Sequence, residues 1–296
     1  MDTANLKAFL KVAETRSFSM AAEQLYLTQP AISKRIKQLE EQLGSRLIDR
    51  MGKQLTLTRT GEMLLPKARQ ILLDLQSIQQ QIADMEGNPM GSVSMATSHH
   101  IGLHRLPPVL RAYTAEYPEV DLDLHFLDSE QACTLIEHNQ MDLAVVTLPF
   151  VQSSALEFHK VWDDNLKIVC ASNHPLSAVK SLTLNLLTHH PAILPSHGTF
   201  TREAIEQALA SYRDELKISL ETNYLETIKM MVSVGLGWSI LPLSMVDHSL
   251  VALDFDEFSC SRQLGIVINP RRSHSRAVDA MMQTIRQFAD LSAPSE

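Results

Sequence analysis

The chain has too few cysteines for a fold stabilised by disulfides or by zinc. Its 296 residues include only Cys133, Cys170 and Cys260, which are far apart and form no C-x-x-C pair. An odd, widely spaced set argues against a disulfide framework and against a cysteine-based structural zinc site. We expect the three thiols to be buried and structural.

Long apolar runs are also missing. Hydrophobic residues make up 45% of the chain, but their runs are short and broken by polar residues, well under the ~20 residues that a membrane helix needs. The first residues follow an amphipathic helix pattern and not the charged-then-apolar pattern of a secretory signal. We expect a globular cytoplasmic protein with no membrane partner.

Catalytic signatures are absent as well. The sequence holds no G-x-S-x-G, no G-x-x-x-x-G-K-[ST] and no H-E-x-x-H motif. Scattered serine, histidine and aspartate residues are expected by chance in a chain of this length. The twelve histidines show no spacing that we assign to metal ligands. We therefore predict no enzyme activity, no cofactor and no metal site.

Positive charge is scarce overall but is concentrated at one end. The formal net charge is −8, yet residues 1–60 carry +4 and the remaining residues carry −12. A basic amino-terminal module with an acidic remainder can bind DNA through one end while the rest of the chain repels it.

Residues 17–44 predict two short helices separated by a tight break. Ser19 is a candidate cap for the first, whose small residues Ala21 and Ala22 allow a second helix to cross closely. The second begins with Thr28 as N-cap and Pro30 in its first turn, and Gly44 ends it. Its inward residues at helical spacing are Ala31, Ile32, Ile36, Leu39 and Leu43.

The outer face of this second helix is polar and basic. An amide and a hydroxyl can read base edges there, and cations can meet phosphates or guanine acceptors. Such a face suits a helix in the major groove, although an ordinary solvated face is the alternative. Residues 47–57 then predict a hairpin with Arg50 and Lys53 near its tip, and a hairpin directly after a recognition-type helix is a wing.

Residues 58–86 show the most regular helical periodicity in the chain. Apolar residues alternate steps of four and three, which is typical of a coiled-coil seam and predicts a partner helix from a second subunit. A long helix packed on its own domain is the alternative. The predicted dimerisation residues are Leu64, Ala68, Ile71, Leu75, Ile78, Ile82 and Met85.

From residue 91 the pattern changes to alternating strands and helices. Strand patterns cover 93–96, 122–127, 143–147, 167–171, 192–194, 217–221, 238–242 and 263–269. Helical patterns cover 103–116, 129–139, 201–212, 225–234 and 275–291. Two similar α/β runs, with the chain returning to the first at its end, predict a two-lobed binding domain.

These segments together resemble a known family. Residues 1–61 look like the winged helix-turn-helix of LysR-type transcriptional regulators, through SFSMAAEQLYLTQPAISKRIKQLEEQLG at 17–44, LIDR at 47–50 and LTLTRTG at 55–61. The second half resembles the family's effector domain, which is similar to type II periplasmic binding proteins. The stretches that match are LPPVLRAYTAEYPEV (106–120), QMDLAVV (140–146), NHPL (173–176) and MVSVGLGWSILP (231–242).

The resemblance implies a multi-domain chain. Residues 1–61 would form the all-α winged helix-turn-helix DNA-binding domain, 58–89 a dimerisation linker helix and hinge, and 91–296 a two-lobed α/β effector domain. Its first lobe would hold 91–162 plus 267–296, and its second 163–266. The implied partners are promoter DNA, a small-molecule effector, further copies of the chain in a homodimer and homotetramer, and RNA polymerase as a candidate.

The DNA-binding residues fall into two groups. Gln29, Pro30, Ser33 and Lys34 are predicted to contact bases, with Pro30 offering apolar contact to a thymine methyl. The others are predicted to bind phosphate or to enter the flanking minor groove. They are Thr28, Arg35, Lys37, Arg50, Lys53 and Thr58.

Two polar stretches are candidates for the effector site. In a two-lobed α/β domain the ligand occupies the cleft at the carboxyl ends of the strands, facing helix N-termini. Hydroxyls and imidazoles there suit a small anion such as a carboxylate, although serine and threonine at such turns also act as ordinary helix caps. The candidates are Thr97, Ser98, His99, His100, Ser196, Thr199 and Thr201, together with Asn223, which the resemblance adds.

We interpret the chain as a transcriptional regulator controlled by a small molecule. One alternative is a redox- or pH-sensing regulator of the same architecture. Another is a DNA-binding protein whose carboxyl-terminal half only oligomerises. An exported solute receptor fits less well, because the chain carries a DNA-reading module.

Overall fold

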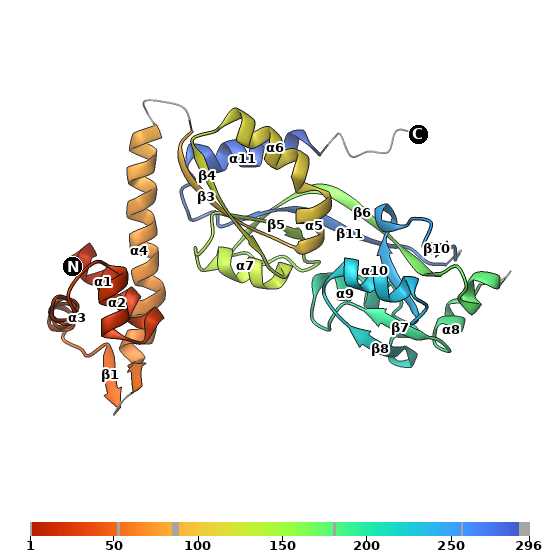
Figure 1. The fold of residues 1–296 in the computed structure, drawn as a ribbon, viewed down its shortest axis with the longest axis horizontal. Coiled ribbons are helices and arrows are strands. Elements are labelled where there is room, and N and C mark those ends of the chain that lie inside the picture. Colours follow the sequence, from red (N-terminus) through yellow and green to blue (C-terminus); the bar gives the residue numbers. More distant parts are fainter. Residues whose placement is uncertain (1, 52–53, 85–88, 180–181, 256, 290–296) are drawn as a thin grey trace. The chain divides into compact units, whose positions relative to one another are not determined.

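A computed structural model describes residues 2–51, 54–84, 89–179, 182–255 and 257–289 (Figure 1). The chain forms two compact units. The first holds residues 1–87 with 138–140, and the second holds 88–137 and 141–296.

The first unit is a small helical domain with a hairpin and a long helix. Its elements are α1 (Thr3–Thr15), α2 (Phe18–Gln24), α3 (Gln29–Leu43), β1 (Ile48–Met51), β2 (Gln54–Leu57) and α4 (Arg59–Asp84). β1 and β2 pair antiparallel, so the predicted winged helix-turn-helix is present. The carboxylate of Glu40 on α3 accepts the backbone N–H of Leu47 at 2.7 Å, which ties the wing to the helix.

The helix ends follow local side-chain chemistry, with one difference from the prediction. Ser17, and not Ser19, caps α2, because its hydroxyl accepts the N–H of Met20 at 3.3 Å while Ser19 lies inside the helix. Thr28 occupies the N-cap position of α3 in an extended conformation, but its side chain makes no capping bond. Gly44 ends α3 at φ +64°, a left-handed conformation in which glycine has no Cβ strain.

One hydrophobic core holds this unit together. Ala21 and Ala22 are buried where α2 meets its neighbours, and Ile32, Ile36 and Leu39 of α3 are buried with them. Leu43, predicted to face inward, is instead partly exposed at the last turn of α3.

The first half of α4 belongs to the same core, which corrects part of the predicted dimer seam. Ala68 is completely buried inside its own domain, so its side chain has no surface to offer a second subunit. Leu64 and Ile71 also pack against this core. Leu75 and Ile78 are 38% and 51% exposed. The side chain of Ile82, and Met85, lie outside the described residues.

The second unit is built on one mixed sheet. Its strands are β3 (Gly91–Thr97), β4 (Val120–Phe126), β5 (Leu143–Thr147), β6 (Glu157–Ala171), β7 (Pro191–Leu194), β8 (Lys217–Glu221), β9 (Trp238–Pro242), β10 (Leu250–Leu253) and β11 (Cys260–Ile268). Their order is β4-β3-β5-β11-β6-β9-β7-β8, and β10 pairs with β6. Parallel pairs lie towards the two ends, and the antiparallel strands β6 and β11 run through the middle.

Helices cover both faces of each half of the sheet. They are α5 (His99–His104), α6 (Leu106–Glu116), α7 (Ser129–Glu137), α8 (Leu184–Leu187), α9 (Phe200–Ala208), α10 (Leu225–Ser233) and α11 (Arg276–Gln287). Short 3₁₀ turns lie at Pro175–Ala178, Arg213–Glu215 and Leu243–Met245. In the first lobe, α6 and α11 lie side by side on one face and α7 lies on the other (Figure 1). In the second lobe, α9 and α10 contribute to different cores.

The two long strands carry the chain between the lobes. On β6, Trp162 packs in the first-lobe core and Leu166 in the second-lobe core. On β11, Cys260 belongs to the second lobe, whereas Leu264 and Ile266 already belong to the first. The second crossing therefore comes earlier than the boundary at 267 that the sequence suggested.

A bulge in this crossing requires glycine. The pairing of β11 with β6 shifts register between Leu264 and Gly265. A Cβ on Gly265 would lie 2.2 Å from the carbonyl oxygen of His159, which is part of the backbone and cannot rotate away. The two strands can approach this closely at the crossing only because residue 265 is glycine and has no side chain.

Candidate DNA-binding surface and effector cleft

The outer face of α3 presents the predicted base-reading residues. Gln29, Pro30 and Lys34 are exposed, Ser33 is half-buried, and the buried residues of the helix lie on the other side. Of the predicted phosphate contacts, Thr28 and Lys37 are exposed and Arg35 is half-buried. The ammonium of Lys37 lies 3.6 Å from the carboxylate of Glu41, but both groups face solvent and such a pair is weak.

Thr58 has a structural role that conflicts with the predicted phosphate contact. Its hydroxyl donates to the carbonyl oxygen of Arg46 at 2.7 Å and accepts the N–H of Gly61 at 3.0 Å, which caps α4. Because a hydroxyl has a single proton, Thr58 cannot also donate to a phosphate oxygen in this arrangement. The side chain of Arg50, and Lys53, lie outside the described residues.

Tyr26 is a surface feature that the sequence reading missed. It lies in the turn between α2 and α3, has φ +53°, and its side chain is 96% exposed. The N–H groups of Tyr26 and Leu27 bond back to the carbonyls of Glu23 and Ala22, which holds the turn. An aromatic ring is therefore presented beside the N-terminus of α3.

A cavity of about 310 Å³ lies between the two lobes of the second unit. Six of the predicted effector residues line it: Ser98, His99, His100, Thr199, Thr201 and Asn223. The first three come from the start of α5 in the first lobe. The others come from the start of α9 and from the turn before α10 in the second lobe.

Two predicted residues do not line the cavity. Thr97 is fully buried, and its hydroxyl donates to the carbonyl oxygen of Val145 at 2.8 Å, which links β3 to β5. Ser196 is not among the lining residues, and its backbone N–H donates to the side-chain oxygen of Asn223 at 2.9 Å. Both residues are used in hydrogen bonds inside the domain, Thr97 through its hydroxyl and Ser196 through its backbone N–H.

Arg262 is the main lining residue that the sequence reading missed. It is buried on β11, and its Nε donates to Oδ2 of the buried Asp164 at 2.8 Å. Its Nη2 lies at the same distance from that oxygen without hydrogen-bond geometry, and its Nη1 donates to the hydroxyl of Thr201 at 2.7 Å. A single arginine in a strand has no motif around it, so only its tertiary neighbours reveal it.

Carboxylates of the first lobe bond to the second lobe across this cavity. Glu130, on α7, accepts the backbone N–H of Phe200 at the first turn of α9. Asp128 accepts from the side-chain amide of Asn223 at 2.7 Å. Burial raises the pKa of Glu130, and the Phe200 N–H opposes that shift. The N-terminus of α9 thus already binds a carboxylate, one that belongs to the protein itself.

The three cysteines are buried, free thiols. Burial raises the pKa of Cys133 to about 12, of Cys170 to about 11 and of Cys260 to about 12. Because the thiolate is the form that reacts with oxidants, these values disfavour the redox-sensing alternative.

Two family matches cover nearly the whole chain. Residues 3–62 match the bacterial regulatory helix-turn-helix proteins of the lysR family, and residues 86–290 match the LysR substrate binding domain. The chain belongs to the LysR family.

Relatives of this LysR-family protein extend over its full length. It is 29% identical over 266 residues to the HTH-type transcriptional activator CmpR of Synechocystis sp., covering 88% of this chain and 87% of CmpR. A variant of full-length OxyR from Pseudomonas aeruginosa has a TM-score of 0.75 at 22% identity, covering 100% of this chain and 99% of that one. The effector binding domain of QuiR in complex with shikimate has a TM-score of 0.61 at 20% identity, covering 69% and 99%.

The predicted family, fold class and general function are confirmed. This LysR-family protein is a DNA-binding transcriptional regulator with a small-molecule effector domain, and its relatives are named as regulators and not as enzymes. Among the helices of the described residues, none is both long and apolar enough to cross a membrane.

Proposed function

We propose that this LysR-family regulator reads its operator with α3 and responds to a small carboxylate bound between the lobes of the second unit. Base contacts are assigned to Gln29, Pro30, Ser33 and Lys34. The observation that carries the DNA-binding half is the exposed polar face of α3, opposite three buried apolar residues. The +4 charge of residues 1–60 supports it, since cations that meet phosphates supply most of the nonspecific affinity.

Replacing Gln29 by alanine is expected to weaken binding to the operator by about 1–3 kcal/mol while leaving nonspecific DNA binding unchanged. An amide can pair with two atoms of adenine, and its loss removes sequence information but no charge. Electrophoretic mobility shifts at fixed salt, on operator and on scrambled DNA, measure the specific and the nonspecific affinity.

Gln38→Ala is the matched control, because Gln38 is exposed on the same helix and lies half a revolution from Gln29 around the helix axis. It should bind both DNAs like the wild type. Equal losses on operator and scrambled DNA for Gln29→Ala would count against base reading by this residue.

The carboxylate class of the effector rests on the bond from Phe200 to Glu130. A helix N-terminus offers N–H groups and a partial positive charge, and here it holds a carboxylate in a cavity that also contains Arg262. The cavity volume of about 310 Å³ is at the small end of ligand sites. The effector binding domain of QuiR, which has a similar fold, is in complex with shikimate, and this supports a small organic ligand for the present domain.

Replacing Glu130 by alanine is expected to tighten the binding of the effector about 3- to 10-fold, because the ligand no longer competes with an internal carboxylate. Thermal shift with a panel of small carboxylates identifies a ligand. Isothermal titration calorimetry then compares the affinity of the wild type and the variants for that ligand. Glu137→Ala, an exposed acid at the end of the same helix, is the control. Weaker carboxylate binding by Glu130→Ala would overturn competition at this site.

The assembly is also proposed. The exposed Leu75 and Ile78 on α4 support a homodimer that places two copies of α3 on a nearly twofold operator. Effector domains would join two dimers into a homotetramer, and effector binding would favour one assembly state over another.

RNA polymerase is the proposed partner at activated promoters. Because the target is chromosomal DNA, the proposed compartment is the bacterial cytoplasm.

A further inference from the structure

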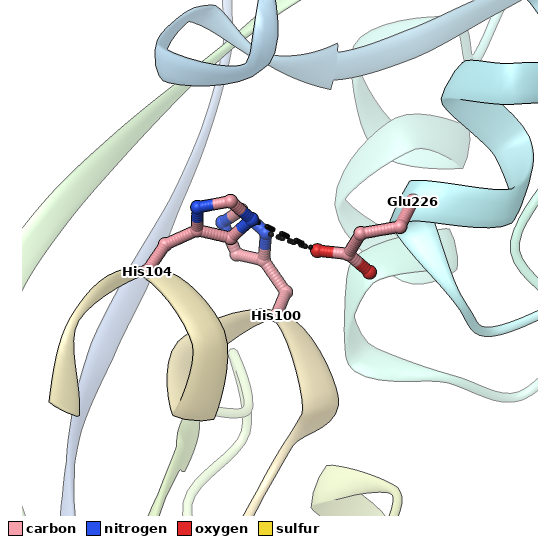
Figure 2. Close-up of side chains that lie close together, drawn as sticks. All are labelled: His100, His104 and Glu226. Carbon is pink, nitrogen blue, oxygen red and sulfur yellow. Dashed lines mark hydrogen bonds and ion pairs between the residues drawn. The ribbon is translucent and has the colours of Figure 1, made fainter. Parts of the chain in front are cut away.

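Three side chains from different lobes meet beside the effector cavity. His100 and His104 lie one turn apart on α5 of the first lobe, and Glu226 lies in the first turn of α10 of the second (Figure 2). The Oε1 atom of Glu226 lies 3.4 Å from Nδ1 of His100 and 3.0 Å from Nε2 of His104. All three potential ligand atoms lie within 4.8 Å of one another.

These separations suit a shared metal ion. Zn²⁺ binds imidazole nitrogen and carboxylate oxygen at about 2.0–2.2 Å, so the ligand atoms of a tetrahedral site lie roughly 3.3–3.5 Å apart. The two nitrogen–oxygen distances already fall close to that range. Small movements of the side chains of His104 and Glu226, which are partly exposed, would complete it.

The hydrogen bonds within the cluster leave buried polar atoms without partners. His100 is only 4% exposed, and its Nε2 has no hydrogen-bond partner among the described residues. The Oε2 atom of Glu226 is buried and unpartnered in the same way. Unpaired buried polar atoms are costly. A metal ion would engage Glu226 through one or both oxygens, and rotation of the His100 ring presents either nitrogen.

The charge state of the cluster also favours a cation. Burial lowers the pKa of His100, which keeps a lone pair available at neutral pH. Burial acts to raise the pKa of Glu226, but hydrogen bonds from His100, a backbone N–H and His104, together with the charge interaction with His100, lower that pKa to about 2, so the carboxyl is ionised. The neighbouring groups whose charge acts on the pKa of His100 are Arg262, Asp164 and His104, and the first two form an ion pair with each other.

We propose that His100, His104 and Glu226 bind a divalent transition-metal ion, with Zn²⁺ as the probe, and that this ion fastens the first lobe to the second. Two imidazoles and one carboxylate suit zinc and its neighbours in the first transition series better than magnesium or calcium. Because His100 also lines the effector cavity, metal binding and effector binding are coupled through a shared residue.

This inference differs from the expectation drawn from the sequence, which assigned no metal ligands. The i, i+4 spacing of His100 and His104 on a helix puts both imidazoles on one face and was the available signal. Glu226 lies more than a hundred positions further along the chain. Only the folded domain brings the third ligand to the pair.

The test uses full-length protein without an affinity tag, stripped with a chelator and titrated with Zn²⁺ against a chromophoric competitor. We expect about one ion per chain, with imidazole and oxygen but no sulfur neighbours in X-ray absorption at the zinc edge. His104→Gln and Glu226→Gln should each weaken zinc binding at least about 10-fold, since even an outer-shell partner is worth that much. Zinc should raise the melting temperature of the wild type but of neither variant.

His125→Gln is the matched control. His125 is a partly exposed histidine on β4 whose Nε2 lies 3.0 Å from the carboxylate of Asp123, so it pairs with an acid but has no third ligand among the described residues. It should bind zinc like the wild type. Circular dichroism checks that each variant is folded.

The proposal is overturned if the stripped wild type takes up no zinc, if both cluster variants bind zinc as tightly as His125→Gln, or if sulfur appears among the ligands. Operator binding is measured on the same samples. A protein that binds its operator but not zinc refutes the metal site alone, so the two proposals fail separately.

Discussion

Replacing Leu75 and Ile78 together by aspartate is expected to give a monomer whose affinity for the operator is about 100-fold lower or worse. Both residues are exposed on α4 and fall at the three-residue step of the apolar pattern. Two facing aspartates would bring like charges into a seam that needs apolar contact. Without a dimer, the second copy of α3 loses the high effective concentration that linkage provides, which is the basis of the 100-fold figure.

Sedimentation velocity and operator mobility shifts measure the two consequences. Met63→Asp is the control, because Met63 is an exposed apolar residue of the same helix outside the seam pattern. Ile71→Asp is a poor test, since Ile71 packs on the core of its own domain and a charge there would unfold it. A double variant that still sediments as a dimer would refute the seam.

Replacing Arg262 by methionine is expected to destabilise the effector domain by about 3–5 kcal/mol. Arg262 and Asp164 face each other on paired strands at the crossing between the lobes, and both are buried. Methionine fills a similar volume but leaves the Asp164 carboxylate with one ion-pair partner among the described residues, Arg105 at 3.9 Å. The charge that remains, more than the lost bonds, sets the cost.

Urea unfolding followed by tryptophan fluorescence measures this loss specifically. Both tryptophans of the chain, Trp162 and Trp238, are buried in the second unit, so the signal reports on that unit. Lys160→Met is the control, because it breaks an exposed pair with Asp163 on the same strand and should cost less than about 1 kcal/mol. The double variant Arg262→Met with Asp164→Leu should recover much of the stability. A loss as small as that of Lys160→Met would contradict a buried-charge penalty.

Local patterns predicted most of the helices, the wing and most of the strands, because each depends on residues close together in the chain. The period of α3 and its end at Gly44 are examples. The sequence did not distinguish between two roles that the same residue type can have. Thr97, Ser196 and Thr58 are hydroxyls at the ends of strands or helices, and the structure uses them, or the backbone beside them, for internal hydrogen bonds.

The apolar periodicity of α4 was also insufficient to predict what packs against the helix. Its apolar stripe is continuous in sequence, but the first part is covered by the domain that precedes it and the part with Leu75 and Ile78 is not. A period gives the face of a helix that is apolar. It carries no information on which partner covers that face along its length.

The sequence by itself determined the order of domains, the charge contrast between the basic first 60 residues and the acidic remainder, and the polar face of α3, since composition and helical spacing are properties of neighbouring residues. Tertiary structure alone decided the pairs that act across the lobes: Glu130 with the start of α9, Arg262 with Asp164, and Glu226 with His100 and His104. These partners lie on separate elements that meet only because β6 and β11 carry the chain twice between the lobes. Their chemistry depends on distance and burial in the folded domain, which no local pattern specifies.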